Sequence, residues 1–320
     1  MEYRYPFPSD PVGWFQVAWS EDLAAGEVLP IHYFGRDLVL FRTESGDAAV
    51  LDAHCPHLGA HLGHGGTVDG DSIVCPFHAW RYGPDGRCRE ARFSARQSPP
   101  DVEIRSWPVC EVSGLILIHY HPEGELPDYI PEPVGEYEAS GWVGYETYRY
   151  NVRMHVQELA ENVPDGVHFN YVHGVGATPS VEYVTKGPVY RQVTSVPATG
   201  PGGAPTVFRQ EVQGLGFIVL RTDAPFGQVQ VVCPTPVDEE YVDFRASLLF
   251  YEGKGTPRLS ERSRAMSRLM ATQFEADIRI WENKVYWKSP GMVEEDAALA
   301  ALRRWARQFY PHAGGESGPL

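Results

Sequence analysis

The sequence predicts an α+β protein in two parts: an all-β first part, and a second part that combines strands with long helices. Three observations lead to this fold class. Residues 12–120 hold short apolar or alternating runs separated by turn residues. Prolines then interrupt the segment 121–138, and a helical periodicity extends over about 260–287. Because 320 residues are too many for one ordinary hydrophobic core, two domains are expected.

The first domain, expected over residues 1–125, is interpreted as all-β because it shows no helical period. Glycine, proline and aspartate supply the turns between its strands, as in Gly83–Gly86. The clearest expected strands are 37–43, 48–53, 71–75 and 114–120.

The second domain, expected over residues 126–320, shows both strand and helix periodicities. A loop rich in proline and glycine occupies 194–206. The expected strands are 142–152, 226–237 and 240–251, and the expected helices are 154–163, 260–287 and 301–310.

Composition and charge exclude several classes of protein. A net charge of -15, with no run of lysine and arginine, disfavours binding to nucleic acid or to an anionic membrane. The chain shows no signal-peptide core and no apolar run near the roughly 20 residues that span a bilayer. Its five cysteines are an odd and sparse set, unlike a disulfide framework. We therefore expect a cytoplasmic protein without a membrane span.

Two loops that each begin with Cys-Pro and carry a histidine form the first candidate site. The first loop holds Cys55 and His57, and the second holds Cys75 and His78. A structural zinc ion accepts two cysteines and two histidines, but zinc fingers group each type together. One of each from each loop is the order that a Rieske [2Fe–2S] cluster needs. Core cysteines beside unrelated surface histidines are the simplest alternative.

A second candidate site contains Asp165, His168 and His173. A mononuclear Fe(II) oxygenase needs two imidazoles and one carboxylate on one face of the metal. On an ideal helix the two histidines would point about 140° apart, so the helix must be distorted or must end. Gly174 is consistent with a helix end. Two histidines near a helix end can equally serve as packing groups.

The carboxylate of this second site is expected to be Asp277. Steps of about 100° per residue along the predicted helix put Asp277 in the middle of an apolar stripe. A buried carboxylate needs a cation or a strong donor, which a metal ion or a buried salt bridge can supply. Glu275 is a rival ligand, but it should face solvent. The expected stripe consists of Met266, Met270, Phe274, Trp281 and Val285.

Both motifs resemble those of the Rieske non-haem iron oxygenases. CPHLG…CPFHAW, over 55–80, is similar to the Rieske signature, and ENVPDGVHFNYVH, over 161–173, is similar to E-N-x-x-D-x-x-H-x4-H. The resemblance implies an N-terminal Rieske fold and a C-terminal helix-grip (START-like) catalytic domain. It implies a [2Fe–2S] cluster on Cys55, His57, Cys75 and His78. It also implies a mononuclear Fe(II) on His168, His173 and Asp277, with O2 as co-substrate.

The same resemblance implies an assembly and partners. Asp165 matches the aspartate that links the two metal centres across a subunit boundary, which implies a relay from His78 through Asp165 to His168 in a homotrimer. The chain has no Gly-rich dinucleotide-binding fingerprint. We therefore expect a separate ferredoxin or flavin reductase to deliver electrons from NAD(P)H.

The C-terminal part narrows the resemblance to one branch. QFEADIRIWENKVY, over 273–286, and LRRWARQFY, over 302–310, resemble the 3-ketosteroid 9α-hydroxylase oxygenase component and the Neverland-type cholesterol 7-desaturases. This branch implies a steroid-like substrate, for which 175–235 would supply the pocket. Alternating apolar residues there could line a cavity or form ordinary core, namely Phe217, Ile218, Phe226, Val229 and Val231.

Three functional hypotheses follow from the sequence. The first is a terminal oxygenase that hydroxylates or desaturates a small apolar substrate of steroid, sterol or polycyclic type. The second keeps this chemistry for a smaller aromatic, amine or secondary metabolite. The third is a Rieske electron carrier whose second domain holds no iron.

Overall fold

The computed structural model describes residues 4–7, 9–93, 100–174, 179–198, 205–222 and 227–311. The chain divides into two compact units. The smaller unit comprises Phe15–Ile130 with Val237–Glu239, and the larger unit comprises Met1–Trp14, Pro131–Pro236 and Glu240–Leu320. Among the residues described, no helix is both long and apolar enough to cross a membrane.

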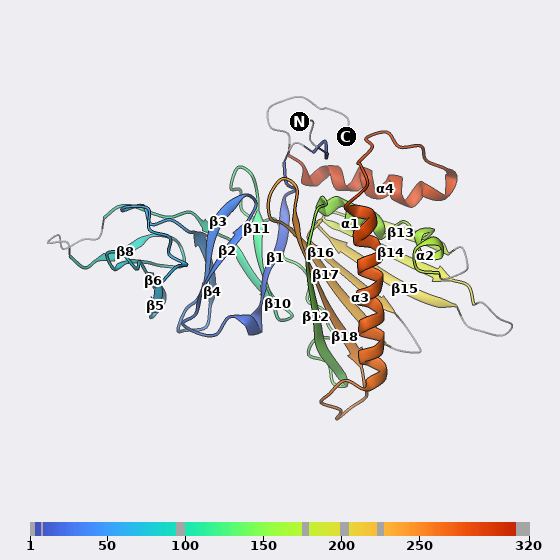
Figure 1. Ribbon diagram of the computed structural model, residues 1–320, viewed down its shortest axis with the longest axis horizontal. Coiled ribbons are helices and arrows are strands. Elements are labelled where there is room, and N and C mark those ends of the chain that lie inside the picture. Colours follow the sequence, from blue (N-terminus) through green and yellow to red (C-terminus); the bar gives the residue numbers. More distant parts are fainter. Residues whose placement is uncertain are drawn as a thin grey trace. The chain divides into compact units, whose positions relative to one another are not determined.

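Antiparallel sheets make up the smaller unit, in the strand orders β2-β3-β4-β9, β5-β6-β7-β8 and β1-β11-β10. Figure 1 shows the strands of this unit in blue to green, joined by long loops. The first six strands are β1 Gly13–Trp19, β2 Val28–Tyr33, β3 Arg36–Arg42, β4 Ala48–Asp52, β5 Thr67–Asp69 and β6 Ser72–Val74. The other five are β7 Trp80–Tyr82, β8 Cys88–Ala91, β9 Ser106–Trp107, β10 Val109–Val112 and β11 Leu115–Tyr120.

Apolar runs of the sequence form the most buried strands of this unit. β3 buries four consecutive residues from Leu38, and β11 buries five from Leu115. Apart from one 3-10 turn, Ser20–Asp22, the described part of the unit has no helix. The expected all-β fold is therefore confirmed, and the four expected strands correspond to β3, β4, β6 and β11.

One seven-stranded antiparallel sheet forms the larger unit, in the order β12-β18-β17-β16-β15-β14-β13. Alternation along β14 shows how its residues divide between the two faces, because Tyr190, Gln192 and Thr194 are buried while their neighbours are half-exposed. The strands are β12 Trp142–Val152, β13 Ser180–Lys186, β14 Val189–Val196, β15 Thr206–Gln213, β16 Phe217–Thr222, β17 Gln228–Pro236 and β18 Val242–Tyr251.

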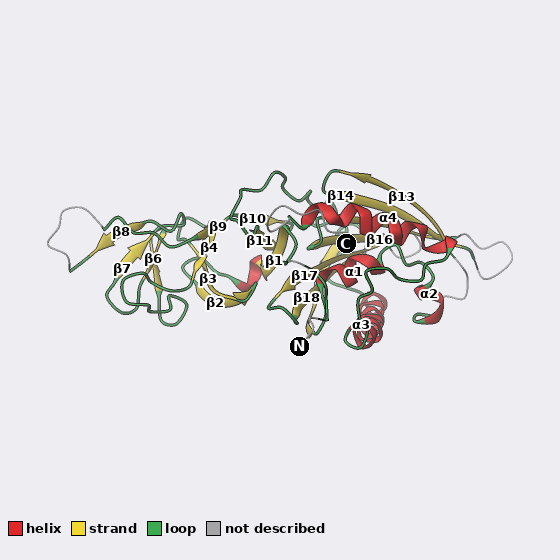
Figure 2. Cartoon of the chain, turned by 90° about the horizontal axis from the view of Figure 1, so that it is seen from above, coloured by secondary structure: helices red, strands yellow, loops and turns green. Residues whose placement is uncertain are grey.

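Helices accompany this sheet, and α3 is the longest of them. The helices are α1 Val156–Asn162, α2 His168–Tyr171, α3 Glu261–Trp281 and α4 Ala297–Ala306. A 3-10 turn precedes α4 at Glu294–Asp296, and another follows it at Arg307–Phe309. Ser260 caps α3, since its hydroxyl accepts the backbone N–H of Ser263 at 3.2 Å. Figure 1 shows α3 beside β12 and β18, and Figure 2 views it end-on. The combination of strands and helices confirms the expected α+β class.

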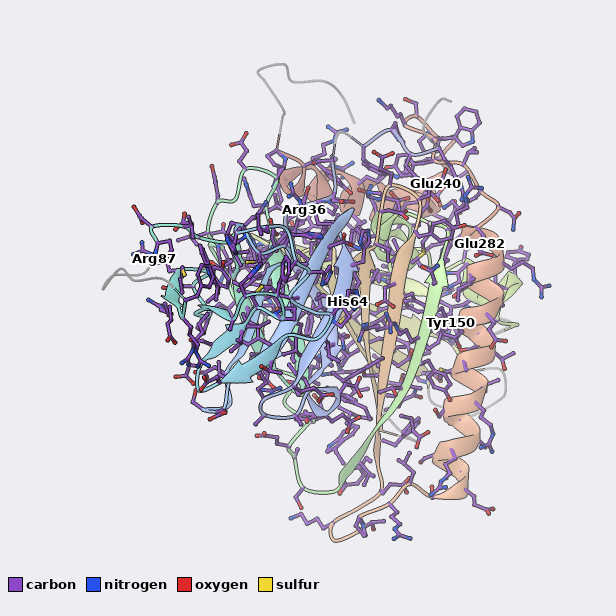
Figure 3. The ribbon with its side chains drawn as sticks, turned by 60° about the vertical axis from the view of Figure 1, so that its left-hand side comes forward. Arg36, His64, Arg87, Tyr150, Glu240 and Glu282 are labelled. Carbon is purple, nitrogen blue, oxygen red and sulfur yellow. The ribbon has the colours of Figure 1, made fainter. Side chains whose placement is uncertain are left out.

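Side chains of β12 meet α3 directly. The hydroxyl groups of Tyr148 and Ser267 lie 2.8 Å apart. Figure 3 labels Tyr150 on β12. Burial raises the pKa of its phenol, and the nearby carboxylate of Glu275 on α3 raises this pKa further. One face of α3 is therefore held against the sheet.

The C-terminal end of α3 differs from the sequence expectation. The helix ends at Trp281 rather than at Trp287. The side-chain amide of Asn283 donates to the carbonyl of Arg279 at 2.8 Å, and such local bonds compete with continuation of a helix. Val285 therefore lies beyond the helix and is 54% exposed, so including it in the buried stripe was wrong. Figure 3 labels Glu282 at this end of α3.

Candidate functional site

The two Cys-Pro loops of the smaller unit are tight turns that bury their cysteines. In the first, the N–H of Gly59 donates to the carbonyl of Cys55 at 2.8 Å; in the second, the N–H of Ala79 donates to the carbonyl of Cys75 at 3.0 Å. The two cysteines are 2% and 3% exposed. The thiol of Cys55 lies 3.1 Å from the hydroxyl of Tyr82. Both loops therefore hold their thiols rigidly inside the unit.

The histidines of these loops face one another at the surface of the same unit. The ring centroids of His57 and His78 are 4.7 Å apart, and His57 stacks on Trp80 at 4.4 Å. Burial, with a further contribution from Cys55, raises the pKa of the Cys75 thiol, so a thiolate there needs a nearby cation. Two buried thiols and two half-buried imidazoles in adjacent loops fit a [2Fe–2S] cluster of Rieske type.

In the larger unit, the histidines expected in the second site lie at the two ends of α2. His168 is its first residue, and the helix has ended at Tyr171 before His173 is reached. Gly174 follows with φ +67°, a conformation that glycine adopts easily at a helix end. The expected break between the two histidines is therefore present. Because of it, the two rings come within 5.1 Å of each other, centroid to centroid.

Asp277 of α3 completes this group. One ligand-type atom from each of His168, His173 and Asp277 lies within 4.8 Å of the others, and no other such trio occurs among the residues described. The nearest carboxylate oxygen of Asp277 is 3.3 Å from Nε2 of His173. Asp277 is 7% exposed, whereas its rival Glu275 is exposed. The three side chains fit a mononuclear metal with two imidazoles and one carboxylate.

Asp165 orients His168 through backbone and side-chain contacts. Its carboxylate accepts the backbone N–H of His168 at 3.2 Å, and its carbonyl accepts Nδ1–H of the ring. A proton on Nδ1 leaves Nε2 with a free lone pair, as metal-binding histidines require. Burial lowers the pKa of His168 despite the opposing effects of Asp277 and Asp165. The ring is therefore neutral with a fixed tautomer, as a metal-binding histidine must be.

Asn162, at the end of α1, is a site residue that the sequence interpretation did not single out. Its amide nitrogen lies 3.2 Å from Nε2 of His168 and 3.4 Å from a carboxylate oxygen of Asp277. It therefore lies beside the two atoms that would face a metal. The signal was present in the sequence, since Asn162 is the second residue of the E-N-x-x-D motif.

Glutamines of the sheet hold the chain just before Asp165. The carbonyl of Val163 accepts the amide of Gln192 at 2.7 Å and that of Gln210 at 3.5 Å. Gln192 is 2% exposed, and it also accepts the hydroxyl of Tyr190 at 2.7 Å. These bonds fix the end of α1 on the sheet and so fix where the segment with Asp165 and His168 begins.

A cavity of about 220 Å³ opens beside the three ligand-type residues, between the sheet and α3. Its walls are mainly apolar and come from the face of α3 that carries Asp277 and from β15, β16 and β17. The apolar residues of α3 and β18 that line it are Met266, Met270, Phe274, Trp281 and Phe244. Asp277, between Phe274 and Trp281 on the apolar stripe of α3, therefore lies in the cavity wall.

Five apolar residues of the segment 217–231 were candidates for either a cavity wall or ordinary core, and one of the four that the structure describes lines the cavity. Ile218 lines the cavity, but Phe217, Val229 and Val231 do not, and Phe226 lies outside the described residues. Side chains alternate between the faces of a strand, so the residues between the expected ones face the cavity instead. Those residues are Leu220, Thr222, Gln228, Gln230 and Val232. On β17 the more apolar residues, Val229 and Val231, lie on the opposite face.

Comparison with protein families identifies both parts of the chain. A family described as the 3-ketosteroid 9alpha-hydroxylase C-terminal domain matches residues 118–310, which is more than half of the chain. The Rieske [2Fe-2S] domain matches residues 13–108. The first match contains the group of His168, His173 and Asp277, and the second contains both Cys-Pro loops.

Individual relatives match both parts together. A cholesterol 7-desaturase nvd of Xenopus laevis is 32% identical, and the match covers 95% of this chain and 72% of the relative. A probable 3-ketosteroid-9-alpha-monooxygenase, oxygenase component, of Rhodococcus rhodochrous is 31% identical, with 93% and 79% covered. Both relatives are thus similar over nearly the whole of this chain.

Solved structures share the fold. The crystal structure of dicamba monooxygenase bound to dicamba superposes with a TM-score of 0.74 over 93% of this chain and 96% of that one, at 19% identity. At this identity the likeness concerns the fold alone. The family matches and the two relatives place the chain in the 3-ketosteroid 9alpha-hydroxylase family, as a Rieske non-haem iron oxidoreductase.

Proposed function

We propose that this chain is the terminal oxygenase component of a multicomponent Rieske system. It uses O2 and electrons from NAD(P)H to hydroxylate or desaturate a steroid-like, sterol-like or polycyclic substrate. The observation that carries the proposal is the group of His168, His173 and Asp277 in the wall of a mainly apolar cavity. Relatives named as a 3-ketosteroid monooxygenase and as cholesterol desaturases support the substrate class.

The residues that would hold the cofactors follow from the two groups described. In domain 1–125, Cys55 and Cys75 would hold one iron of a [2Fe–2S] cluster, and His57 and His78 the other. In domain 126–320, a mononuclear Fe(II) would be held by His168, His173 and Asp277. When bound, these groups supply one-electron transfer and activation of O2, which side chains alone cannot provide.

The cavity wall determines what the chain itself does to the substrate. Apolar side chains of α3 and β16 exclude water and hold a rigid hydrocarbon body, while Asp277 and the two histidines lie along one side of it. A C–H bond of the substrate is thereby held next to the metal position. Asn162 is an amide donor at the same position, and it can hydrogen-bond an oxygen atom there.

Asp165 is proposed to link the two metal centres. By resemblance to the family, the relay runs from His78 of one copy of the chain through Asp165 to His168 of the next copy, in a homotrimer. Its carboxylate already accepts the N–H of His168. Asp165→Asn keeps an acceptor oxygen at this position and removes the charge. Iron content should be retained while turnover falls on the order of 100-fold; unchanged turnover would remove Asp165 from the relay.

The partners and location complete the proposal. Electrons come from a separate flavin reductase, directly or through a ferredoxin, and the protein works in the cytoplasm. The name of the Rhodococcus relative, an oxygenase component, supports a separate electron donor. Gel filtration with light scattering gives the test of the trimer, and a monomer at micromolar concentration would contradict it.

A second candidate function keeps the chemistry and changes the substrate to a smaller aromatic, amine or secondary metabolite. The polar side chains among the apolar walls favour a substrate with hydrogen-bonding groups, and the fold is shared with a dicamba monooxygenase. A Rieske electron carrier without oxygenase activity fits less well. Such a carrier needs about two irons per chain, whereas an oxygenase needs about three.

The test is a substrate screen by mass spectrometry on the iron-loaded protein with a surrogate reductase, NADH and O2. The panel contains 3-ketosteroids, sterols and small aromatics. One oxygen added to a steroid supports a hydroxylase, and loss of two hydrogens from a sterol supports a desaturase. Turnover of the small aromatics alone would overturn the steroid proposal in favour of the second candidate.

A further inference from the structure

Gln228 carries a buried amide whose donor nitrogen is unused among the residues described. It is the first residue of β17, it is 4% exposed, and it lines the cavity. Its Nε2 has no hydrogen-bond partner among the residues described. A buried donor without an acceptor lowers stability, so such groups are uncommon unless a ligand or water satisfies them.

The neighbouring glutamine on the same face of β17 is different. Nε2 of Gln230 contacts the sulfur of Met270 at 3.3 Å. Opposite Gln228, across the ladder, lies Thr222 of β16, which also lines the cavity. The unused donor and a hydroxyl group therefore stand side by side in a wall that is otherwise mainly apolar.

This polar pair lies at the end of the cavity remote from the three ligand-type residues. Next to Asp277 on α3, Phe274 and Trp281 pack on Phe244 of β18. The residue of β18 opposite Gln228, in contrast, is Phe250. Gln228 thus lies toward the opposite end of the sheet from the metal position.

The distance between Gln228 and Asp277 can be estimated from the rise per residue of β17 and α3. Met270 precedes Asp277 by seven residues, or about 10 Å along α3. Gln228 lies two residues beyond Gln230 along β17, or about 7 Å. Because strand and helix are not collinear, the separation is on the order of 15 Å. A single aromatic ring cannot bridge this separation, whereas an elongated fused-ring molecule can span most of it.

We infer that Gln228 donates a hydrogen bond to an oxygen atom at the far end of an elongated, rigid, apolar substrate while its opposite end is oxidised beside Asp277. The acceptor is a ketone or hydroxyl oxygen, since Nε2 is a donor. The inference rests on the proposed function and adds a second point of attachment. With both ends fixed, the apolar walls determine which carbon lies beside the metal position.

The test measures binding rather than turnover. Isothermal titration calorimetry is run with a steroid that carries a terminal ketone at each end, and with analogues that lack one ketone, the other, or both. Wild-type protein should bind about tenfold more weakly when one particular ketone is removed. Gln228→Leu and Gln228→Met both lack the donor, so each should bind the diketone and the analogue without that ketone equally.

Gln230→Leu is the matched control, because its amide is already engaged by Met270. It should retain the tenfold preference between the two analogues. Thermal unfolding of each variant verifies that it is folded, and Gln228→Met preserves the shape of the side chain. Equal binding of all four steroids by the wild type, or a preference retained in both Gln228 variants, would overturn the inference and leave the substrate class intact. Binding of none of the steroids would overturn both.

Discussion

The two groups of candidate metal ligands are built in contrasting ways. Those of the smaller unit fall within 55–78. In each Cys-Pro loop, a backbone N–H later in the loop donates a hydrogen bond to the carbonyl of the cysteine. Those of the larger unit are up to 109 positions apart, from His168 to Asp277, and come from α2, the residues just after it and the C-terminal part of α3. The first group is local and depends on turn chemistry, whereas the second exists only when α3 packs against the sheet.

This contrast suggests that each group can be disrupted without the other. Local loops keep their geometry when a distant element moves, because their hydrogen bonds lie within the loop. A group assembled by packing is sensitive to any residue that positions one of its elements.

Removal of the carboxylate ligand should abolish turnover. Asp277→Ala deletes one of the three proposed ligands of the mononuclear iron, and turnover should fall at least about 1000-fold. Metal analysis should show the loss of about one iron per chain, while the visible spectrum of the cluster is retained. Glu275→Ala is the control, because Glu275 lies on the exposed face of the same helix. If Glu275→Ala lost the iron and Asp277→Ala did not, the ligand assignment would be reversed.

The reciprocal change should remove the cluster and leave the other metal position intact. Cys75→Ser should abolish the visible and electron paramagnetic resonance spectra of the cluster, and with them NADH-driven turnover. The protein should still bind about one Fe(II) or Co(II) in the larger unit. Cys110→Ser, which changes a cysteine outside the two loops, should preserve the spectra. Persistence of the Rieske spectrum in Cys75→Ser contradicts the assignment of that ligand.

A packing residue of the larger unit should affect iron retention. Gln192→Leu leaves the hydroxyl of Tyr190 and the carbonyl of Val163 with fewer partners, which should cost about 1–3 kcal/mol of unfolding free energy. Because Val163 precedes Asp165 and His168, iron should also dissociate faster during dialysis against a chelator.

Gln213→Leu provides a matched control for this effect. Gln213 is as deeply buried in the same sheet, and its amide bonds Glu211 and the backbone of Glu132 rather than the end of α1. It should lower stability by a similar amount without faster iron loss. Equal iron loss in both variants would show that Gln192 acts through general stability alone.

The smallest effect concerns acid sensitivity of the smaller unit. Burial lowers the pKa of His119, on β11, from 6.5 to about 4. The unfolded chain takes up a proton below pH 6.5 and the folded chain does not until about pH 4, so stability falls as the pH is lowered through this window. His119→Gln should reduce this loss by about 1.4 kcal/mol per pH unit at most.

Urea unfolding at pH 7 and pH 5, followed by bleaching of the cluster, measures this difference. His32→Gln changes a histidine whose side chain is 49% exposed and serves as the control. A pH dependence that is the same in wild type and His119→Gln would exclude His119 as its source.

Sequence patterns predicted strands more reliably than the faces of those strands. The run over 142–152 is found unchanged as β12, because its length and composition suit a strand. Hydrophobicity pointed to Phe217 on β16 and to Val229 and Val231 on β17, but both faces are buried all along β17 and in the first half of β16. When neither face is solvated, alternation of apolar residues no longer shows which face adjoins a cavity.

The C-terminal end of α3 and the role of Asn162 also depended on contacts that spacing does not reveal. Hydrophobic periodicity continued to Val285, and a side-chain bond from Asn283 accompanies the earlier end. Asn162 stands in a recognisable motif, yet its proximity to both His168 and Asp277 arises from the packing of α1 near α3.

The sequence alone determined the ligand types and the order of the two parts. Cysteine and histidine in matched loops, and a carboxylate on an apolar helix face, indicate metal ligands, because such side chains need a cation when they are buried and ionised. The tertiary structure decided which side chains line the cavity and left the donor of Gln228 without a partner. The reason is that local chemistry follows from neighbouring residues, whereas a cavity is shaped by elements far apart in the chain.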